Sequence, residues 1–286
     1  MKKSQVIRQQ IRTIFIIYVF LVLCFCALKG YARQNYIKRI ISLGPAITEQ
    51  LYLLGAENNL VANTVYCTRP TEAQNKEKIG TVIEVNLEKI VSLKPDLVIA
   101  TSLSNPKQIQ KLENLGIRVL KLPLAENFQQ ICKQFLELGK VVKKEKEAQE
   151  IIKKSKKEVD DIYKTIKNLP KPKVIVQVGT NPLWVATQNS FVNDFIKFAG
   201  GINIGPYNNG LYSREKIIKD NPDIIIIITM GIAGKQEKEI WQKYKTINAV
   251  KNNKIYIMDS YKLCSPTPVS FVEMLKEIVE ILHPKQ

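Results

Sequence analysis

The sequence predicts an α/β protein of two lobes, each built on a central, mainly parallel β-sheet flanked by helices, with one long rigid helix between the lobes. Three observations predict this fold. Helix-like and strand-like segments alternate along the chain. A short motif occurs once in each half, at an offset of 127 residues. Between the halves lies a tract with the apolar spacing of a single long helix.

The N-terminal segment has the pattern of an export signal. A basic start is followed by an uncharged apolar stretch from Thr13 to Leu28, and Gly30 and Ala32 place small residues before a cut after Ala32. The stretch is short for a membrane-spanning helix, which needs about 20 apolar residues. We therefore expect residues 1–32 to be a signal peptide or an uncleaved N-terminal anchor. The protein is expected in the periplasm or on the extracytoplasmic face of the membrane.

The first lobe is predicted at residues 38–142. Leu97–Ala100 is apolar without alternation, as in a buried parallel strand. Asn86 can cap the helix before it, and Lys94-Pro95 ends that helix. Strands are expected at 39–43, 60–62, 97–100 and 118–122, and helices at 45–54, 86–94 and 105–115.

The connecting helix is predicted at residues 145–169, because apolar residues recur there at steps of three and four and Pro170 follows. Periodicity alone leaves open an ordinary surface helix within one domain. The second lobe, residues 173–283, is predicted to repeat the order of strands and helices of the first. We expect a strand at 173–178, a turn at 179–182, and a helix at 191–199 that Gly200 and Gly201 end.

The repeated motif reads NLEKIVSLKPDLVIAT at residues 86–101 and YSREKIIKDNPDIIIIIT at 212–229. It places Glu88 and Glu215 at equivalent helix starts, where the helix dipole favours a carboxylate. The two acids can simply stabilise their helices. Alternatively, they can meet basic residues on a symmetric partner.

Composition and residue inventory exclude several classes of function. The net charge is +17, but the lysines lie among glutamates on helix-like segments, as on solvated helix faces, so no nucleic-acid binding is predicted. The single histidine, His283, rules out a histidine-based triad or a histidine-rich metal site. No Walker loop or dinucleotide fingerprint occurs. We predict that the chain is not an enzyme.

A cleft between two such lobes is the natural ligand site, since loops after parallel strands converge there. Aromatic residues on these loops give large contact areas. Cys67 and Cys264 are also expected to approach the cleft. They can ligate a soft metal, form a disulfide bridge, or remain unreactive thiols. The aromatic candidates for ligand binding are Tyr66, Trp184, Tyr212 and Tyr261.

The chain resembles the periplasmic binding proteins of ABC importers for vitamin B12 and iron complexes, the Fe/B12 periplasmic-binding family. The resemblance covers residues 38 to 283. It is carried by RIISLGPAITEQLYLLGA, VNLEKIVSLKPDLVIA, LGIRVL, FVNDFIKFAGGIN and YSREKIIKDNPDIIIIIT. It implies a class III periplasmic binding protein. It also implies a monomer without a cofactor that binds a metal chelate, either a corrinoid such as cobalamin or an iron–siderophore or haem-like complex.

The resemblance further implies that Glu88 and Glu215 dock onto the membrane subunits of the importer. Tyr66 and Asp259 match ligand-site positions of the B12 binders. Val82, Asn209 and Leu263 depart from that pattern, and Arg69 is expected to supply the positive charge that Leu263 lacks.

A second hypothesis is a metallo-chaperone or enzyme that reuses the fold, with Cys67 and Cys264 as its working groups.

Overall fold

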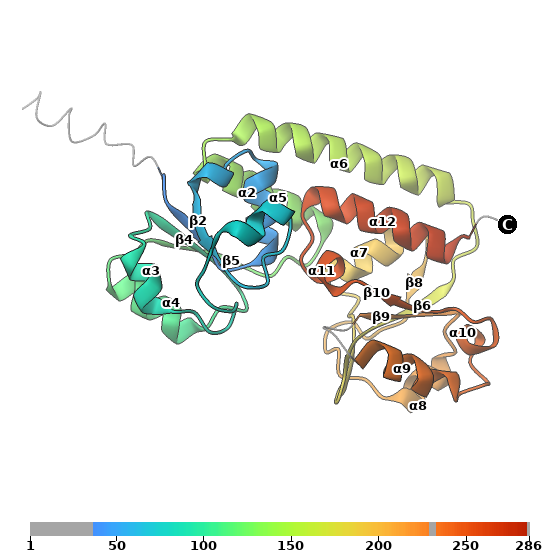
Figure 1. Ribbon diagram of the computed structural model, residues 1–286. Helices are drawn as coiled ribbons and strands as arrows, with labels where there is room; N and C mark the ends of the chain where they lie inside the picture. The colour runs from blue at the N-terminus through green and yellow to red at the C-terminus, as the bar shows by residue number, and fades with distance from the viewer. Residues whose placement is uncertain (1–36, 229–232, 285–286) are drawn as a thin grey trace, which may run out of the picture. The chain divides into compact units, whose positions relative to one another are not determined.

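The computed structural model describes residues 37–228 and 233–284 (Figure 1). Residues Lys38–Gln286 form one compact unit. The predicted signal or anchor, residues 1–32, lies outside the described residues. Within the described ranges, no helix is long and apolar enough to cross a membrane.

The first sheet has the order β3-β2-β1-β4-β5, and every neighbouring pair of strands is parallel. This confirms the predicted parallel α/β layer. The strands are β1 (Ile40–Ser42), β2 (Leu60–Asn63), β3 (Glu77–Lys78), β4 (Leu97–Thr101) and β5 (Val119–Leu122). The helices between them are α2 (Pro45–Leu53), α3 (Leu87–Ser92) and α4 (Pro106–Asn114), with short 3-10 helices η1 (Glu57–Asn59) and η2 (Thr71–Asn75).

Helices cover both faces of this sheet. Ile41 and Val98 pack with Ile90 of α3 and Ile109 of α4 in one buried cluster. On the other face α2 packs against β1 and β2. Strands buried on both faces need no polar alternation, which explains the apolar run of β4.

The second sheet has the order β10-β9-β6-β7, with β8 also paired to β6. All its pairs are parallel except β6 with β7. The strands are β6 (Lys173–Thr180), β7 (Leu183–Val185), β8 (Ile202–Asn203), β9 (Ile224–Ile228) and β10 (Ile255–Met258). The helices of this part are α7 (Phe191–Phe198), α8 (Arg214–Asp220), α9 (Ala233–Gln242), α10 (Asn248–Lys251), α11 (Ser260–Cys264) and α12 (Pro268–Leu282).

Alternate residues of the central strands of this sheet face opposite helix layers. Val174 and Ile226 join the cluster that includes α7 and α12, whereas Ile175 and Ile225 join the cluster that includes α8, α9 and α10. Figure 1 shows α8, α9 and α10 on the opposite side of β6, β9 and β10 from α7 and α12. The side-chain period of two along a strand therefore divides the core into two layers.

Helices α5 (Phe128–Val141) and α6 (Glu145–Ile166) lie between the two sheets in sequence. Helix α6 packs against α5 and α12. Phe128, at the start of α5, stacks on Phe271 of α12 at 4.4 Å between ring centroids, and Phe271 stacks on Phe195 of α7 at 4.0 Å. Burial of each such side chain stabilises the fold by about 2–3 kcal/mol. A helix that follows the first sheet thus contributes to the core of the second.

The repeated motif forms the same local structure in both copies. The side chains of Asn86 and Ser213 each cap a helix by accepting the backbone N–H three residues further on, at 2.9 and 3.2 Å. Both helices end in a left-handed residue, Lys94 with φ 44° and Asn221 with φ 50°. The strands β4 and β9 that follow keep the 127-residue offset. The internal repeat is therefore structural.

Two elements differ from the sequence-based expectations. Helix α6 ends at Ile166, three residues before the predicted end, because Lys167 is its C-cap. The segment 173–178, predicted as a strand with a turn after it, extends to Thr180 and pairs antiparallel with β7. The predicted turn at Asn181-Pro182 is thus the turn of a hairpin.

Candidate functional site

The segments at the carboxyl-terminal edges of the two sheets meet in a direct contact between side chains. Arg69 belongs to the loop after β2, and Tyr261 lies in α11 just after β10. The guanidinium carbon of Arg69 lies 4.0 Å from the centre of the Tyr261 ring. Loops after parallel strands lie at the carboxyl edge of their sheet. The contact therefore brings together the two edges at which a ligand of this fold would bind.

Glu49 of α2 adds a second contact between the same parts. Its Oε2 lies 3.2 Å from Nη2 of Arg69, and its Oε1 accepts a hydrogen bond of 3.3 Å from the Thr267 hydroxyl at the start of α12. The side chains of Glu49 and Arg69 are only 13% and 28% exposed. Burial raises the pKa of Glu49, against the opposing effect of Arg69. Burial, followed by the charge of Glu49, raises the pKa of Tyr261.

Local sequence holds the second-lobe partners in place. Asp259 caps α11 by accepting the backbone N–H of Tyr261 at 2.6 Å. Thr267 and Ser270 form a reciprocal capping box at the start of α12. Such caps satisfy backbone donors that a helix leaves free. Asp259, a predicted ligand residue, is thus engaged in positioning Tyr261.

The loop after β2 turns its residues in opposite directions. Tyr66 is 56% exposed, whereas Cys67 is fully buried. The Cys67 sulfur lies 3.2 Å from the Thr64 hydroxyl. Tyr66 therefore offers an aromatic surface to solvent at this edge, while Cys67 is packed inside the protein.

Cys264 is exposed in α11, and Cys67, Cys132 and Cys264 are all free thiols. Burial raises the pKa of Cys132 to about 11, as expected for a core thiol. Among the described residues, no group of three or more histidine, cysteine or acidic side chains is placed to hold a metal ion.

Two predicted aromatic residues lie on other elements. Trp184 is 41% exposed on β7, where it forms an isolated bridge with Leu211. Tyr212 packs against the cluster under α8, α9 and α10, and its hydroxyl donates a hydrogen bond of 2.9 Å to Asp220. The contacts of Tyr212 therefore connect it with α8 rather than with Arg69 and Tyr261.

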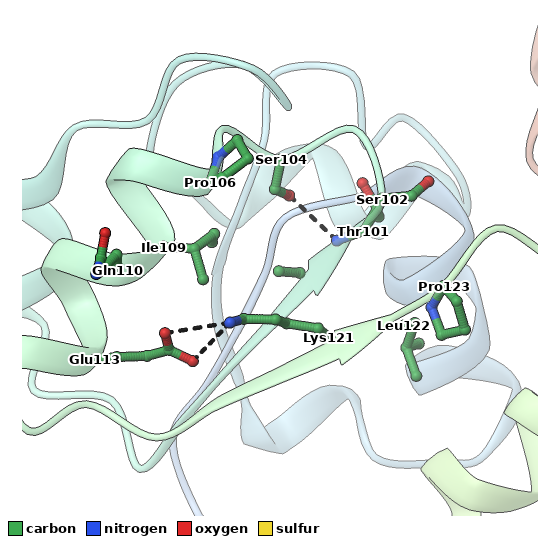
Figure 2. A pocket seen from close by; sticks show the side chains of 11 residues that line it. Thr101, Ser102, Ser104, Pro106, Ile109, Gln110, Glu113, Lys121, Leu122 and Pro123 are labelled. Carbon is green, nitrogen blue, oxygen red and sulfur yellow. Dashed lines mark hydrogen bonds and ion pairs between the residues drawn. The ribbon is translucent and has the colours of Figure 1, made fainter.

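A cavity of about 520 Å³ lies at the carboxyl ends of β4 and β5, beside α4 (Figure 2). In Figure 2, Lys121 extends across its floor toward Glu113, at 2.9 Å, and the Ser104 hydroxyl accepts the Thr101 N–H at 3.2 Å. The charges and hydroxyls of this lining are thus largely satisfied by one another. The cavity is a recess of mixed polar and apolar lining at the same edge of the first sheet as Tyr66.

The glutamates of the repeated motif, Glu88 and Glu215, are exposed in the first turns of α3 and α8. A hydrogen bond from its own backbone N–H, and then one from the Ser213 hydroxyl, keep the pKa of Glu215 below its usual value. Neither carboxylate forms an ion pair within the part of the chain that the structure describes.

The lysine that follows each of these glutamates is already paired. Lys89 pairs with Glu77, and Lys216 pairs with Asp220. In each copy of the motif the glutamate is therefore an exposed negative charge, and the lysine that follows it is engaged elsewhere.

Sequence reasoning missed Glu49 and Thr267. The available signals were Glu49 as the single charged residue of its helix and the Thr267-Pro268 start of the last helix. Nothing in either segment indicates that the two would meet.

Residues 40–262 match the model of the family described as "Periplasmic binding protein". The chain is 31% identical over 258 residues to the "Uncharacterized ABC transporter substrate-binding lipoprotein YvrC" of Bacillus subtilis, which covers 86% of this chain and 80% of that protein. It is 27% identical over 237 residues to the "Vitamin B12-binding protein" of Vibrio vulnificus strain CMCP6, covering 81% and 85%. Among solved structures, a possible iron-binding (periplasmic solute-binding) protein from Staphylococcus epidermidis superposes with a TM-score of 0.77 at 29% identity, covering 87% of this chain and 100% of that one.

Proposed function

The chain belongs to the periplasmic binding protein family, and from this membership we propose that it binds a corrinoid metal chelate between its two lobes and delivers it to the membrane subunits of an ABC importer. The named functions of its relatives are binding functions for transport, in agreement with the prediction that the chain is not an enzyme. The relatives are periplasmic or lipoprotein binding proteins, consistent with an extracytoplasmic location.

The observation that best supports a corrinoid ligand is the ion pair of Arg69 with Glu49. The sequence predicted that Arg69 supplies a free positive charge for the ligand. Its guanidinium instead lies against the Glu49 carboxylate and over the Tyr261 ring. A neutralised arginine gives little attraction to a strongly anionic siderophore or to the carboxylates of haem. A corrinoid such as cyanocobalamin, whose ring carries uncharged amide side chains, suits this surface better.

Tyr66 supports the same proposal. It is exposed at the edge where the two lobes meet. The family resemblance implies that it takes the place of a ligand-site tyrosine of the B12 binders. An exposed aromatic ring gives a flat apolar contact with a polar end, which fits the face of a macrocycle. The Vibrio vulnificus relative is named for binding vitamin B12.

Delivery rests on Glu88 and Glu215. Their equivalent positions on α3 and α8, and the pairing of their lysine neighbours, leave two carboxylates that can meet basic residues on a two-fold symmetric membrane partner.

The ligand class is tested by calorimetric titration of the protein with cyanocobalamin, haemin and ferric citrate. We expect saturable binding of cyanocobalamin and at least about tenfold weaker binding of the two carboxylate-bearing chelates, a difference of about 1.4 kcal/mol. Tyr66→Ala should weaken cyanocobalamin binding. Tyr163→Ala, a similarly exposed tyrosine on α6, is the matched control and should not change it. Preference for ferric citrate or haemin would overturn the corrinoid proposal.

A further inference from the structure

The outer surface of the second lobe carries an unbalanced positive charge. Between Ala233 and Lys254 the sequence has six lysines and two glutamates, and no aspartate or arginine. We call the six lysines the basic face. They are Lys235, Lys238, Lys243, Lys245, Lys251 and Lys254.

Three of these lysines lie in helices that bury their other side, Lys235 and Lys238 in α9 and Lys251 in α10, and the other three lie in the segments that follow these helices. Gly234, Glu237 and Trp241 of α9 are buried, as is Ala249 of α10. The lysines of the basic face are exposed or half-buried. Within α9 and α10 the helical spacing thus places a buried side against the sheet and the lysines toward solvent.

The acids near the basic face are engaged elsewhere. Glu237 is buried and pairs with Arg214 of α8. Asp220 pairs with Lys216, and Asp223 accepts a hydrogen bond from Asn248 at 3.0 Å. In the described part of the chain, no lysine of the basic face is in an ion pair. Glu239 is the one acid of the 233–254 stretch that stays exposed.

The first lobe lacks an equivalent surface. Helix α4 follows β4 as α9 follows β9, but it carries two lysines and Glu113, and Glu113 pairs with Lys121. The charge is thus a property of one lobe and not of the repeated fold.

The chemistry of the basic face fits anionic lipid headgroups better than a protein. Protein interfaces are poor in lysine and rich in aromatic residues and arginine. From Gly234 to Lys254, no large apolar side chain with a described position is strongly exposed. Lysines are flexible point charges that suit a diffuse layer of phosphate groups, and each contributes attraction near an anionic membrane.

The position of the basic face also favours the membrane. The pair Arg214–Glu237 connects the start of α8, where Glu215 lies, with α9, which carries Lys235 and Lys238. If Glu215 docks onto a membrane-embedded subunit, as proposed above, the adjoining surface lies near the bilayer. This orientation rests on the proposed function, whereas the charge itself does not.

We propose that the basic face binds the anionic phospholipid headgroups of the membrane that holds the importer. This binding concentrates the protein at the membrane surface and presents α8 to the permease. The attraction is electrostatic, so it weakens as salt shortens the range of the charges.

The test is co-sedimentation of residues Lys38–Gln286, the compact unit that holds both sheets and their cores, with vesicles. One set of vesicles is phosphatidylcholine, and the other has part of it replaced by phosphatidylglycerol. We expect binding to the second set only, lost at about 1 M salt, where the screening length falls to about 3 Å. Replacement of Lys235, Lys243, Lys245 and Lys251 by glutamine should lower the partition coefficient at least about tenfold.

The matched control replaces four exposed lysines of α6 by glutamine, namely Lys146, Lys153, Lys154 and Lys156. It removes the same charge and should lower the partition coefficient far less. An equal loss in both variants would mean that net charge alone drives binding, and would overturn the proposal. Binding to neither set of vesicles, or to both sets alike, would also overturn it. Since the lipid vesicles hold no permease, failure here leaves the docking role of Glu215 untouched.

Discussion

The guanidinium of Arg69 lies 4.0 Å over the ring of Tyr261, joining the loop after β2 to the helix after β10. The two residues are far apart in the sequence and follow strands of different sheets. Beside this contact, Glu49 reaches both Arg69 and Thr267. The junction between the lobes is therefore fixed by a small polar group, and the same group removes the free charge of Arg69 from the ligand edge.

The cation–π contact should couple the two lobes energetically. We expect Arg69→Met and Tyr261→Leu to be non-additive in urea unfolding, with a coupling energy of about 0.5–2 kcal/mol. Arg118→Met, which removes an exposed arginine of the first lobe, is the control partner for Tyr261→Leu. That second cycle should show additivity. Additivity in both cycles would mean that the contact does not stabilise the folded state.

Glu49 should make stability depend on pH. Because burial raises its pKa above 4.5, the folded state binds a proton more tightly than the unfolded chain. The resulting stabilisation is fully present below pH 4.5 and is lost as pH rises through the folded-state pKa. The measurement is urea unfolding across this pH range. The free energy of unfolding of Glu49→Gln should lack this part of the pH dependence seen in the wild type. If the variant and the wild type show the same pH dependence of the unfolding free energy, the pKa of Glu49 is not raised by folding.

The two aspartates of the repeat should stabilise their lobes equally and independently. The Asp96 carboxylate accepts the backbone N–H of Arg39 at 2.9 Å, and that of Asp223 accepts the N–H of Lys173 at 2.9 Å, so each aspartate ties its strand to the first strand of its sheet. Asp96→Asn and Asp223→Asn should each cost about 1–2 kcal/mol of unfolding free energy.

The double variant should lose the sum of the two costs, because the sites share no partner. Asp160→Asn, an exposed aspartate of α6, is the control and should cost little. A cost for Asp96→Asn no larger than that of the control would argue against this role.

Removal of both docking acids should separate transport from binding. In cells whose uptake depends on this protein, Glu88→Ala with Glu215→Ala should lower cyanocobalamin uptake at least about tenfold, because two charge-assisted contacts with the permease are lost. Affinity for the ligand, measured on the purified protein, should stay unchanged.

The control pair is Glu137→Ala with Glu150→Ala, which removes two exposed glutamates of α5 and α6. It should leave uptake intact. If the docking variant loses ligand affinity instead, Glu88 and Glu215 belong to the binding site and not to docking.

Much of the fold was predictable because its signals are local. The caps Asn86 and Ser213, the Pro-Asp pairs and the apolar runs of β4 and β9 each act within a few residues. The hairpin of β6 and β7 was not predictable, because its pairing across Asn181-Pro182 depends on register and not on composition. The predicted roles of Tyr66, Trp184 and the other ligand residues remain predictions.

The sequence by itself determined two α/β lobes, their internal repeat and the exposed positions of Glu88 and Glu215. Only the tertiary structure decided that Arg69 is neutralised, that Glu49 meets Thr267 across 218 residues, and that Phe128 enters the core of the second sheet. The physical reason is the range of the interactions. Caps, turns and strand runs are set by neighbouring residues, whereas contacts between lobes depend on how whole elements pack, and no periodicity in the chain encodes them.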